Sequence, residues 1–170
     1  MWQYTGAERP DFAESPGPGQ ESVWDYPRPP ALVASEREVL VTHEGVELAR
    51  SCRCVRVLET ASPPTWYIPE DDVDLSRLVP VPGASFCEWK GGARYWALAD
   101  RPAPDPVAWS YPDPTPAFGV IRHAFGFYPG RVACFIDGER VRPQPGYFYG
   151  GWITDEIVGP WKGGEGTGHW

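Results

Sequence analysis

Hydrophobic and polar residues alternate along several short segments of the chain, which is typical of β-strands with one buried face. The alternation runs through residues 37–51 and is interrupted by the turn-forming pair Glu-Gly at 44–45. Residues 131–141 are interrupted in the same way by an Asp-Gly pair at 137–138. Each segment therefore predicts a β-hairpin with a tight turn.

Residues 54–60, with the sequence CVRVLET, predict a further strand. Because successive side chains of a strand point to opposite faces, Glu59 follows on the apolar face of Val57, and Arg56 lies on the other face. A carboxylate on an apolar face needs a partner or a function. If the strand ends at Leu58 instead, Glu59 lies in water, and both alternatives stay open.

The remaining patterns are shorter. Residues 65–69 and 93–98 predict strands, and residues 70–78 predict a single helical turn capped by Asp71 or Asp72. Two further segments carry weaker signals, since glycines restrict a helix in residues 115–127, and residues 154–157 have room only for a turn. The pattern as a whole predicts an all-β fold of short strands joined by long loops.

The first 35 residues differ from the rest, because they contain six prolines and three glycines. Proline fixes φ and donates no hydrogen bond, so residues 1–35 predict an extended arm and not a central strand. We expect Trp24 and Tyr26 to hold this arm against the body, since large aromatic side chains are costly to leave in water. A freely moving tail is the alternative. Residues 36–170 are expected to form a single domain with a glycine-rich C-terminal tail.

Composition and charge narrow the classes of partner. The 170 residues are 42% hydrophobic and include nine tryptophans, which is enough for one buried core. The formal net charge of −8 makes nucleic acid a poor partner, because phosphate backbones attract basic surfaces. No run approaches the ~20 apolar residues of a membrane helix. The N-terminal residues lack the pattern of a secretory signal, so a cytoplasmic protein is expected.

The four cysteines do not predict a metal site. They are Cys52, Cys54, Cys87 and Cys134, and no two of them form a CxxC pair. Zinc sites usually carry such pairs, so the cysteines are interpreted as reduced thiols, and no metal or cofactor is predicted.

Cys87 and Lys90 are candidates for chemistry because a nearby lysine lowers the pKa of a thiol and raises the fraction of nucleophilic thiolate. The alternative is a structural thiol beside an exposed lysine. Lys90 belongs to the letters WKGG at residues 89–92, which recur at residues 161–164. The second copy is interpreted as a coincidence of the tail.

Aromatic residues from separate segments predict a pocket for a flat or cationic ligand if their loops converge. The alternative is that they fill a core that is poor in leucine. The residues are Trp66, Tyr67, Trp89, Tyr95, Trp96, Trp109 and Tyr111.

Several longer motifs resemble one bacterial family. The motifs are VRVLET, WYIPEDDV, FCEWKGGARYW, AWSYPDPTPAF, FYPGRV and FYGGWITDEIVGPWKGG. They resemble the family catalogued as domain of unknown function 427, which is sometimes labelled nucleotidyltransferase-like, from about Glu21 to the C-terminus.

The resemblance implies a β-tent, in which two small antiparallel sheets lean together, as in the zinc-binding Mss-four proteins, the thalidomide-binding domain of cereblon and B-type methionine sulfoxide reductases. Zinc is not carried over, because the paired CxxC motifs are missing. The transferase label has no support in the residues, since no carboxylate pair follows a Gly-Ser turn. The recurrent polar positions of the family fall on Arg56, Glu59, Tyr67, Cys87, Lys90, Tyr95, Trp109 and Tyr111.

Three functions remain open at this point. The first is a domain that binds a small organic ligand in an aromatic-lined pocket, with Arg56, Glu59 and Lys90 as polar anchors. The second is a small-molecule enzyme of hydrolase or transferase type, with Cys87 as nucleophile, Lys90 as stabilising cation and Glu59 as acid or base. The third is a protein-interaction module that uses the proline-rich residues 26–30. A monomer and a homodimer are both compatible with the sequence.

We expect the Lys90 amine to approach Glu59 in the aromatic pocket, with Cys87 on the adjoining strand and the chain reversing at residues 91–92. A buried charge without a partner costs several kcal/mol, and Lys90 is the partner for Glu59 that the motif supplies.

Overall fold

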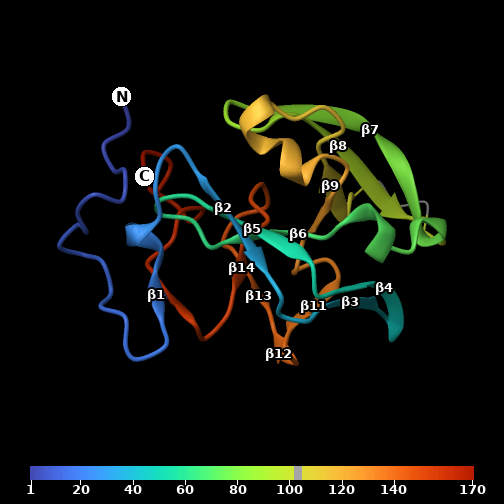
Figure 1. The fold of residues 1–170 in the computed structure, drawn as a ribbon, viewed down its shortest axis with the longest axis horizontal. Helices are drawn as coiled ribbons and strands as arrows, with labels where there is room; N and C mark the ends of the chain where they lie inside the picture. Colours follow the sequence, from blue (N-terminus) through green and yellow to red (C-terminus); the bar gives the residue numbers. More distant parts are fainter. Residues whose placement is uncertain (102–104) are drawn as a thin grey trace.

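The computed structural model describes residues 1–101 and 105–170, which fold almost entirely into short β-strands (Figure 1). The all-β prediction is confirmed. The strands are β1 (Glu21–Ser22), β2 (Ala31–Ser35), β3 (Val39–His43), β4 (Val46–Ser51), β5 (Cys54–Leu58), β6 (Thr65–Tyr67), β7 (Leu78–Cys87), β8 (Gly91–Leu98), β9 (Ala108–Ser110), β10 (Phe125–Phe127), β11 (Ala133–Ile136), β12 (Glu139–Arg140), β13 (Arg142–Pro143), β14 (Trp152–Ile153) and β15 (Ile157–Val158). The 3-10 helices are η1 (Val23–Asp25), η2 (Glu70–Asp72), η3 (Leu75–Arg77) and η4 (Pro116–Ile121).

The described strands form five sheets where two were expected. Two sheets have four strands, in the orders β10-β9-β8-β7 and β12-β11-β3-β4, and a third has the order β2-β5-β6. Two small pairs complete the fold, β13 with β14 and the parallel pair of β1 with β15. Figure 1 shows the β7–β8–β9 layer on one side of β5 and β6, and the β3–β4–β11 layer on the other. None of the helices in the described residues is long and apolar enough to cross a membrane.

Both predicted hairpins are confirmed. The turn between β3 and β4 places Glu44 and Gly45 at φ 50° and 77°, and the turn between β11 and β12 places Asp137 and Gly138 at φ 47° and 83°. Two successive residues with positive φ match the right-handed twist of the flanking strands, and Gly supplies the second at no steric cost.

The β7–β8 hairpin was missed in part, since only residues 93–98 were predicted as strand. β7 contains Pro80 and Pro82 and is an edge strand, where a missing N–H is tolerated. The pairing of β7 with β8 shifts register between Val81 and Ala84, and Pro82 lies in this unpaired stretch. The chain reverses at residues 88–90, and Gly91 already pairs with Cys87, so the reversal comes earlier than expected.

One local prediction is wrong. Residues 70–78 form two 3-10 turns, η2 and η3, and the only side-chain cap there comes from Asp74, which accepts a hydrogen bond from the Ser76 N–H at 3.2 Å. Asp72 instead accepts hydrogen bonds from Ser51 and Arg53 at 2.6 and 2.9 Å. Residues 115–127, where glycines were expected to restrict a helix, contain the short η4 followed by β10.

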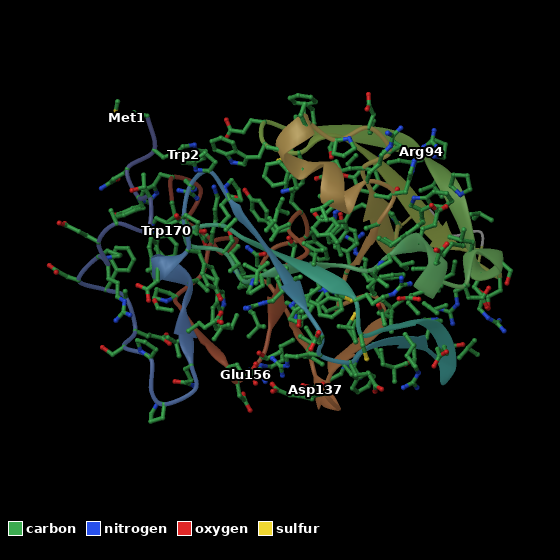
Figure 2. All side chains as sticks on the ribbon, in the orientation of Figure 1. Met1, Trp2, Arg94, Asp137, Glu156 and Trp170 are labelled. Atoms are coloured by element: carbon green, nitrogen blue, oxygen red, sulfur yellow. The ribbon has the colours of Figure 1, made fainter. Side chains whose placement is uncertain are left out.

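The N-terminal arm packs on the body and meets the C-terminal segment there. Trp24 is fully buried, its indole N–H donates to the Pro160 carbonyl at 2.8 Å, and its ring contacts Trp170 edge-on with centroids 5.2 Å apart. Tyr26 is buried and donates to Glu21 at 2.6 Å. Figure 2 shows Trp170 at the arm's end of the molecule. The proline-rich residues of the arm are therefore engaged in contacts within the chain.

Buried hydrophobic residues form three clusters, and one of them surrounds the candidate site. The largest lies around Trp66, Phe127 and Trp152, between the sheets. The second contains Val57, Tyr67, Trp109, Tyr111 and Tyr128, and the third forms where the two ends of the chain pack around Trp24.

Gly126 is the packing partner of Trp109 and provides a test of this second cluster. It lies opposite Trp109 in the β9–β10 ladder, and a Cβ atom there would come within 2.4 Å of the indole. We predict that Gly126→Ala lowers the free energy of unfolding by about 1–3 kcal/mol, because the ring must leave its position. Chemical denaturation measures this. The control is Gly92→Ala, where no atom lies within 4 Å and a change below about 0.5 kcal/mol is expected. Equal effects of the two substitutions would contradict the packing described.

Candidate functional site

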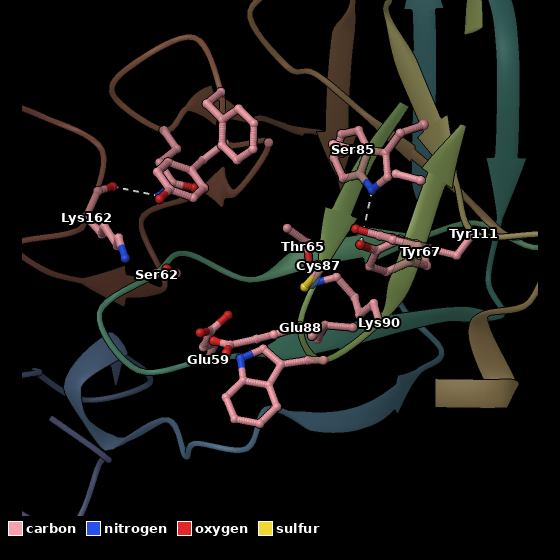
Figure 3. A pocket seen from close by; sticks show the side chains of 18 of the residues that line it. Glu59, Ser62, Thr65, Tyr67, Ser85, Cys87, Glu88, Lys90, Tyr111 and Lys162 are labelled. Carbon is pink, nitrogen blue, oxygen red and sulfur yellow. Dashed lines mark hydrogen bonds between the residues drawn. The ribbon is translucent and has the colours of Figure 1, made fainter. Parts of the chain in front are cut away.

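A cavity of about 410 Å³ opens between the β5–β6 strands, the β7–β8 hairpin and β9 (Figure 3). Its walls are mostly aromatic, and its polar groups come from a few separate segments. Eight of the eleven residues that the sequence singled out line this cavity. They are Glu59, Tyr67, Cys87, Trp89, Lys90, Tyr95, Trp109 and Tyr111. Segments up to 52 residues apart in the chain thus converge on one site.

Trp66 and Trp96 do not line the cavity and pack in and against the largest core cluster. Arg56 is the third exception, and its proposed place as an anchor of this pocket is wrong. It donates to Glu21 at 2.7 Å and lies over the Trp66 ring, 5.5 Å from the centroid. The alternation of β5 explains this, because the period that turns Val57 toward the cavity turns Arg56 to the opposite face. Arg56 instead connects β5 with the N-terminal arm.

Glu59 reaches the cavity from just beyond the end of β5, on the face of Val57. Its ionic partner is Arg28, whose Nε lies 3.2 Å from the carboxylate, and not Lys90. Only 2% of the Arg28 side chain is exposed. The same guanidinium donates to the main-chain oxygens of Tyr4, Thr60 and Trp170 at 3.0, 3.1 and 3.1 Å. The expected Lys90–Glu59 ion pair is thus replaced by a pair with the arm, 31 residues away in sequence.

Lys90 points into the protein, and only 9% of the residue is exposed. Within the described residues no carboxylate lies within 4 Å of its amine, and its Nζ is 5.8 Å from the centroid of the Tyr111 ring. Burial lowers the pKa of Lys90, but the neighbouring Tyr67, Cys87 and Glu59 more than offset burial and hold that pKa above its ordinary value. Lys90 is therefore a cation at neutral pH.

Hydrogen bonds from Thr115 fix the turn at residues 88–90, and this turn directs Lys90 into the protein. Thr115 donates from its hydroxyl to the Trp89 carbonyl at 2.5 Å and from its N–H to the Lys90 carbonyl at 3.1 Å. Gly91 follows with φ 101° and lies so close to the Asp113 carbonyl that a Cβ would come within 3.3 Å of it. The glycine after Lys90 is thus required by backbone geometry.

Two tyrosines stand beside Lys90 at the cavity. The Tyr67 hydroxyl accepts a hydrogen bond from the Trp109 indole N–H at 3.1 Å, and the Tyr67 and Tyr111 rings lie 6.2 Å apart. Burial raises the pKa of Tyr111, so its phenol stays protonated at neutral pH. Figure 3 shows Lys90 and Cys87 close to these two tyrosines, with Lys162 across the cavity.

Cys87 ends β7 and is half-buried at the cavity wall. The other thiols are elsewhere. Burial raises the pKa of Cys54 to about 12, Cys134 is fully buried, and Cys52 is exposed. In the described residues no three His, Cys, Asp or Glu side chains are grouped as metal ligands. Cys87 is thus the one described cysteine that shares a cavity with a cation.

Lys162 was not among the residues singled out from the sequence, where the second WKGG was interpreted as a coincidence of the tail. Lys162 lines the same cavity, where its amine donates to the Trp170 main-chain oxygen at 3.0 Å and lies 5.2 Å from the Trp2 ring centroid. The 15 basic residues comprise 13 arginines and two lysines. Both lysines occur in a WKGG motif and both line this cavity, so the repeated letters were the available signal.

Residues 31–138 match a family described as a domain of unknown function (DUF427). The match begins at β2, later than the expected start near Glu21, and it includes Glu59, Cys87 and Lys90 but neither Arg28 nor Lys162. No curated protein matches the chain. Because the match covers more than half of the 170 residues, the chain belongs to the DUF427 family.

Proposed function

We propose that this protein binds a small organic molecule in the aromatic cavity. The observation that carries the proposal is Lys90, a buried cation that has no carboxylate within 4 Å in the described part of the chain. A buried charge costs free energy unless it is compensated, and a ligand can supply the compensation. Perturbed titratable groups in a cleft are typical of functional sites.

The size and walls of the cavity support the same proposal. A volume of about 410 Å³ lies within the range of small-molecule sites, which are mainly aromatic and apolar with few polar groups. Phe86 and Phe148 line the cavity although they are 79% and 69% exposed, so they lie at its mouth. The net charge of −8 favours a free small molecule over a nucleic acid, and we propose that binding takes place in the cytoplasm.

Filling the cavity tests the proposal without touching Lys90. In a thermal-shift screen of a chemically mixed library, at least one compound is expected to raise the melting temperature of the wild type by about 2–4 °C. Ala93→Leu places a larger side chain in the cavity wall and is expected to lower the affinity for such a compound at least about tenfold. The matched control is Ala84→Leu, an identical change at an exposed residue outside the cavity.

Two results would contradict a ligand site here. One is a library of neutral, cationic and anionic compounds in which none stabilises the wild type. The other is an Ala93→Leu protein that is folded by circular dichroism and still responds to every compound as the Ala84→Leu protein does.

A second candidate function is catalysis by Cys87, either hydrolysis or group transfer. The observation in its favour is that Cys87 and Lys90 lie at the two ends of one turn and line the same cavity. An adjacent cation stabilises a thiolate, which is the nucleophilic form. Glu59 is less suited to act as acid or base, because Arg28 already holds its carboxylate.

Alkylation by iodoacetamide separates a reactive Cys87 from a structural one. Below pH 8, Cys87 is expected to react several-fold faster than the exposed Cys52, and Lys90→Met is expected to remove that advantage. Mass spectrometry of peptides gives both rates in one sample, so Cys52 is the internal control. A Cys87 that reacts no faster than Cys52 in the wild type would exclude the thiolate.

A further inference from the structure

We infer that the cavity recognises molecules that carry a single carboxylate on a flat apolar body, with the carboxylate bound by Lys90. This inference rests on the proposed function and adds the chemical class of the ligand. It follows from the charges, the hydrogen-bond donors and the walls of the cavity.

Four charged side chains line the cavity, and three of them already have compensation. Glu59 is paired with the buried guanidinium of Arg28. Lys162 donates to the main-chain oxygen of Trp170, and Glu88 is exposed to water. Lys90 and Lys162 are both more than nine-tenths buried and neither has a carboxylate within 4 Å among the described residues, but Lys162 has the Trp170 oxygen as an acceptor. Lys90 therefore brings to the cavity a buried positive charge that is not balanced by any carboxylate within 4 Å in the described residues.

The neutral donors around Lys90 also lack acceptors. The Trp89 indole nitrogen is buried and has no hydrogen-bond partner. The Tyr67 hydroxyl accepts from Trp109, so its own proton is free to be donated, and no acceptor for it is found in the described residues. Buried donors are normally satisfied, so this set calls for a ligand rich in acceptors.

A carboxylate meets these requirements better than a phosphate does. Its two oxygens accept about four hydrogen bonds, and its single negative charge balances the single charge of Lys90. A phosphate monoester carries close to two negative charges at neutral pH and would leave one of them buried without compensation. Phosphate sites usually add an arginine fork or a glycine-rich cradle of main-chain N–H groups. No arginine lines this cavity.

The rest of the ligand is constrained by the walls. Trp109 and Tyr128 pack with ring centroids 4.7 Å apart, and Tyr67 meets Trp109 edge-on at 6.1 Å. Aromatic faces and edges favour a flat apolar body. The exposed rings of Phe86 and Phe148 extend this apolar surface to the mouth of the cavity.

Matched acid and amide probes test the inference. The probes are 2-naphthoate against 2-naphthamide and benzoate against benzamide, titrated into the full chain by isothermal calorimetry at constant ionic strength. We expect each acid to bind at least about tenfold more tightly than its amide, as a charge-assisted hydrogen bond provides. Lys90→Met is expected to abolish this preference, because it lowers the affinity for the acids and changes the affinity for the amides by no more than about threefold. Arg94→Met, which removes an exposed charge from the same hairpin, is expected to retain it.

A second readout does not depend on any variant. Because the chain has two lysines, the ¹³Cε–¹Hε signals of Lys90 and Lys162 are resolved by comparison with Lys162→Arg. Naphthoate is expected to shift the Lys90 signal and naphthamide to leave it in place.

Three outcomes overturn the inference: amides that bind as tightly as the acids, a preference that survives Lys90→Met, or 2-naphthyl phosphate that binds more tightly than naphthoate. Absence of binding by every probe also overturns it. The screen of the mixed library then tests the proposed function separately. If a neutral or cationic compound stabilises the wild type but not the Ala93→Leu protein, the cavity is a ligand site with a different preference.

Discussion

The ion pair between Arg28 and Glu59 is the contact on which the arrangement of the chain ends and of the cavity depends. Arg28 comes from the N-terminal arm, is almost completely buried, and also donates to main-chain oxygens of the arm, of the segment after β5 and of Trp170. A buried guanidinium is tolerated only when its donors are satisfied, so these contacts are interdependent. They hold the two ends of the chain together and neutralise the one carboxylate that would otherwise pair with Lys90.

The cavity follows from that arrangement. With Glu59 occupied, the turn after β7 presents a buried lysine to the cavity, together with the unpartnered indole nitrogen of Trp89. Lysine suits this position better than arginine, because its ammonium group is compact and its three N–H donors can rotate, whereas the donors of a guanidinium group are fixed in one plane. Arg28 and Lys162 lie outside the part of the chain that matches the family, so the segments beyond it complete the site.

Much of this structure was predictable from local patterns, and the failures have identifiable causes. The Glu-Gly and Asp-Gly turns determine their hairpins. For Glu59 the sequence left two alternatives open: β5 does end at Leu58, and the side chain nevertheless lines the cavity with Val57. Strand alternation placed Arg56 on the far face, so its role as an anchor conflicted with the pattern itself. β7 was missed because prolines argue against a strand until its position at a sheet edge is known. The Arg28–Glu59 pair was not foreseeable, since no local pattern relates an arm to a strand end 31 residues away.

The central claim is that Lys90 is a buried cation at the aromatic cavity. Heteronuclear NMR of the two lysine side chains, followed from pH 6 to pH 12, measures this most directly because only two signals must be distinguished. Burial lowers the pKa of Lys162, and Arg28 lowers it further, whereas Tyr67, Cys87 and Glu59 hold the pKa of Lys90 above its ordinary value. The account predicts that Lys162 loses its proton first and that Lys90 remains charged beyond the ordinary titration of lysine. A Lys90 amine that is already neutral at pH 7 would contradict it.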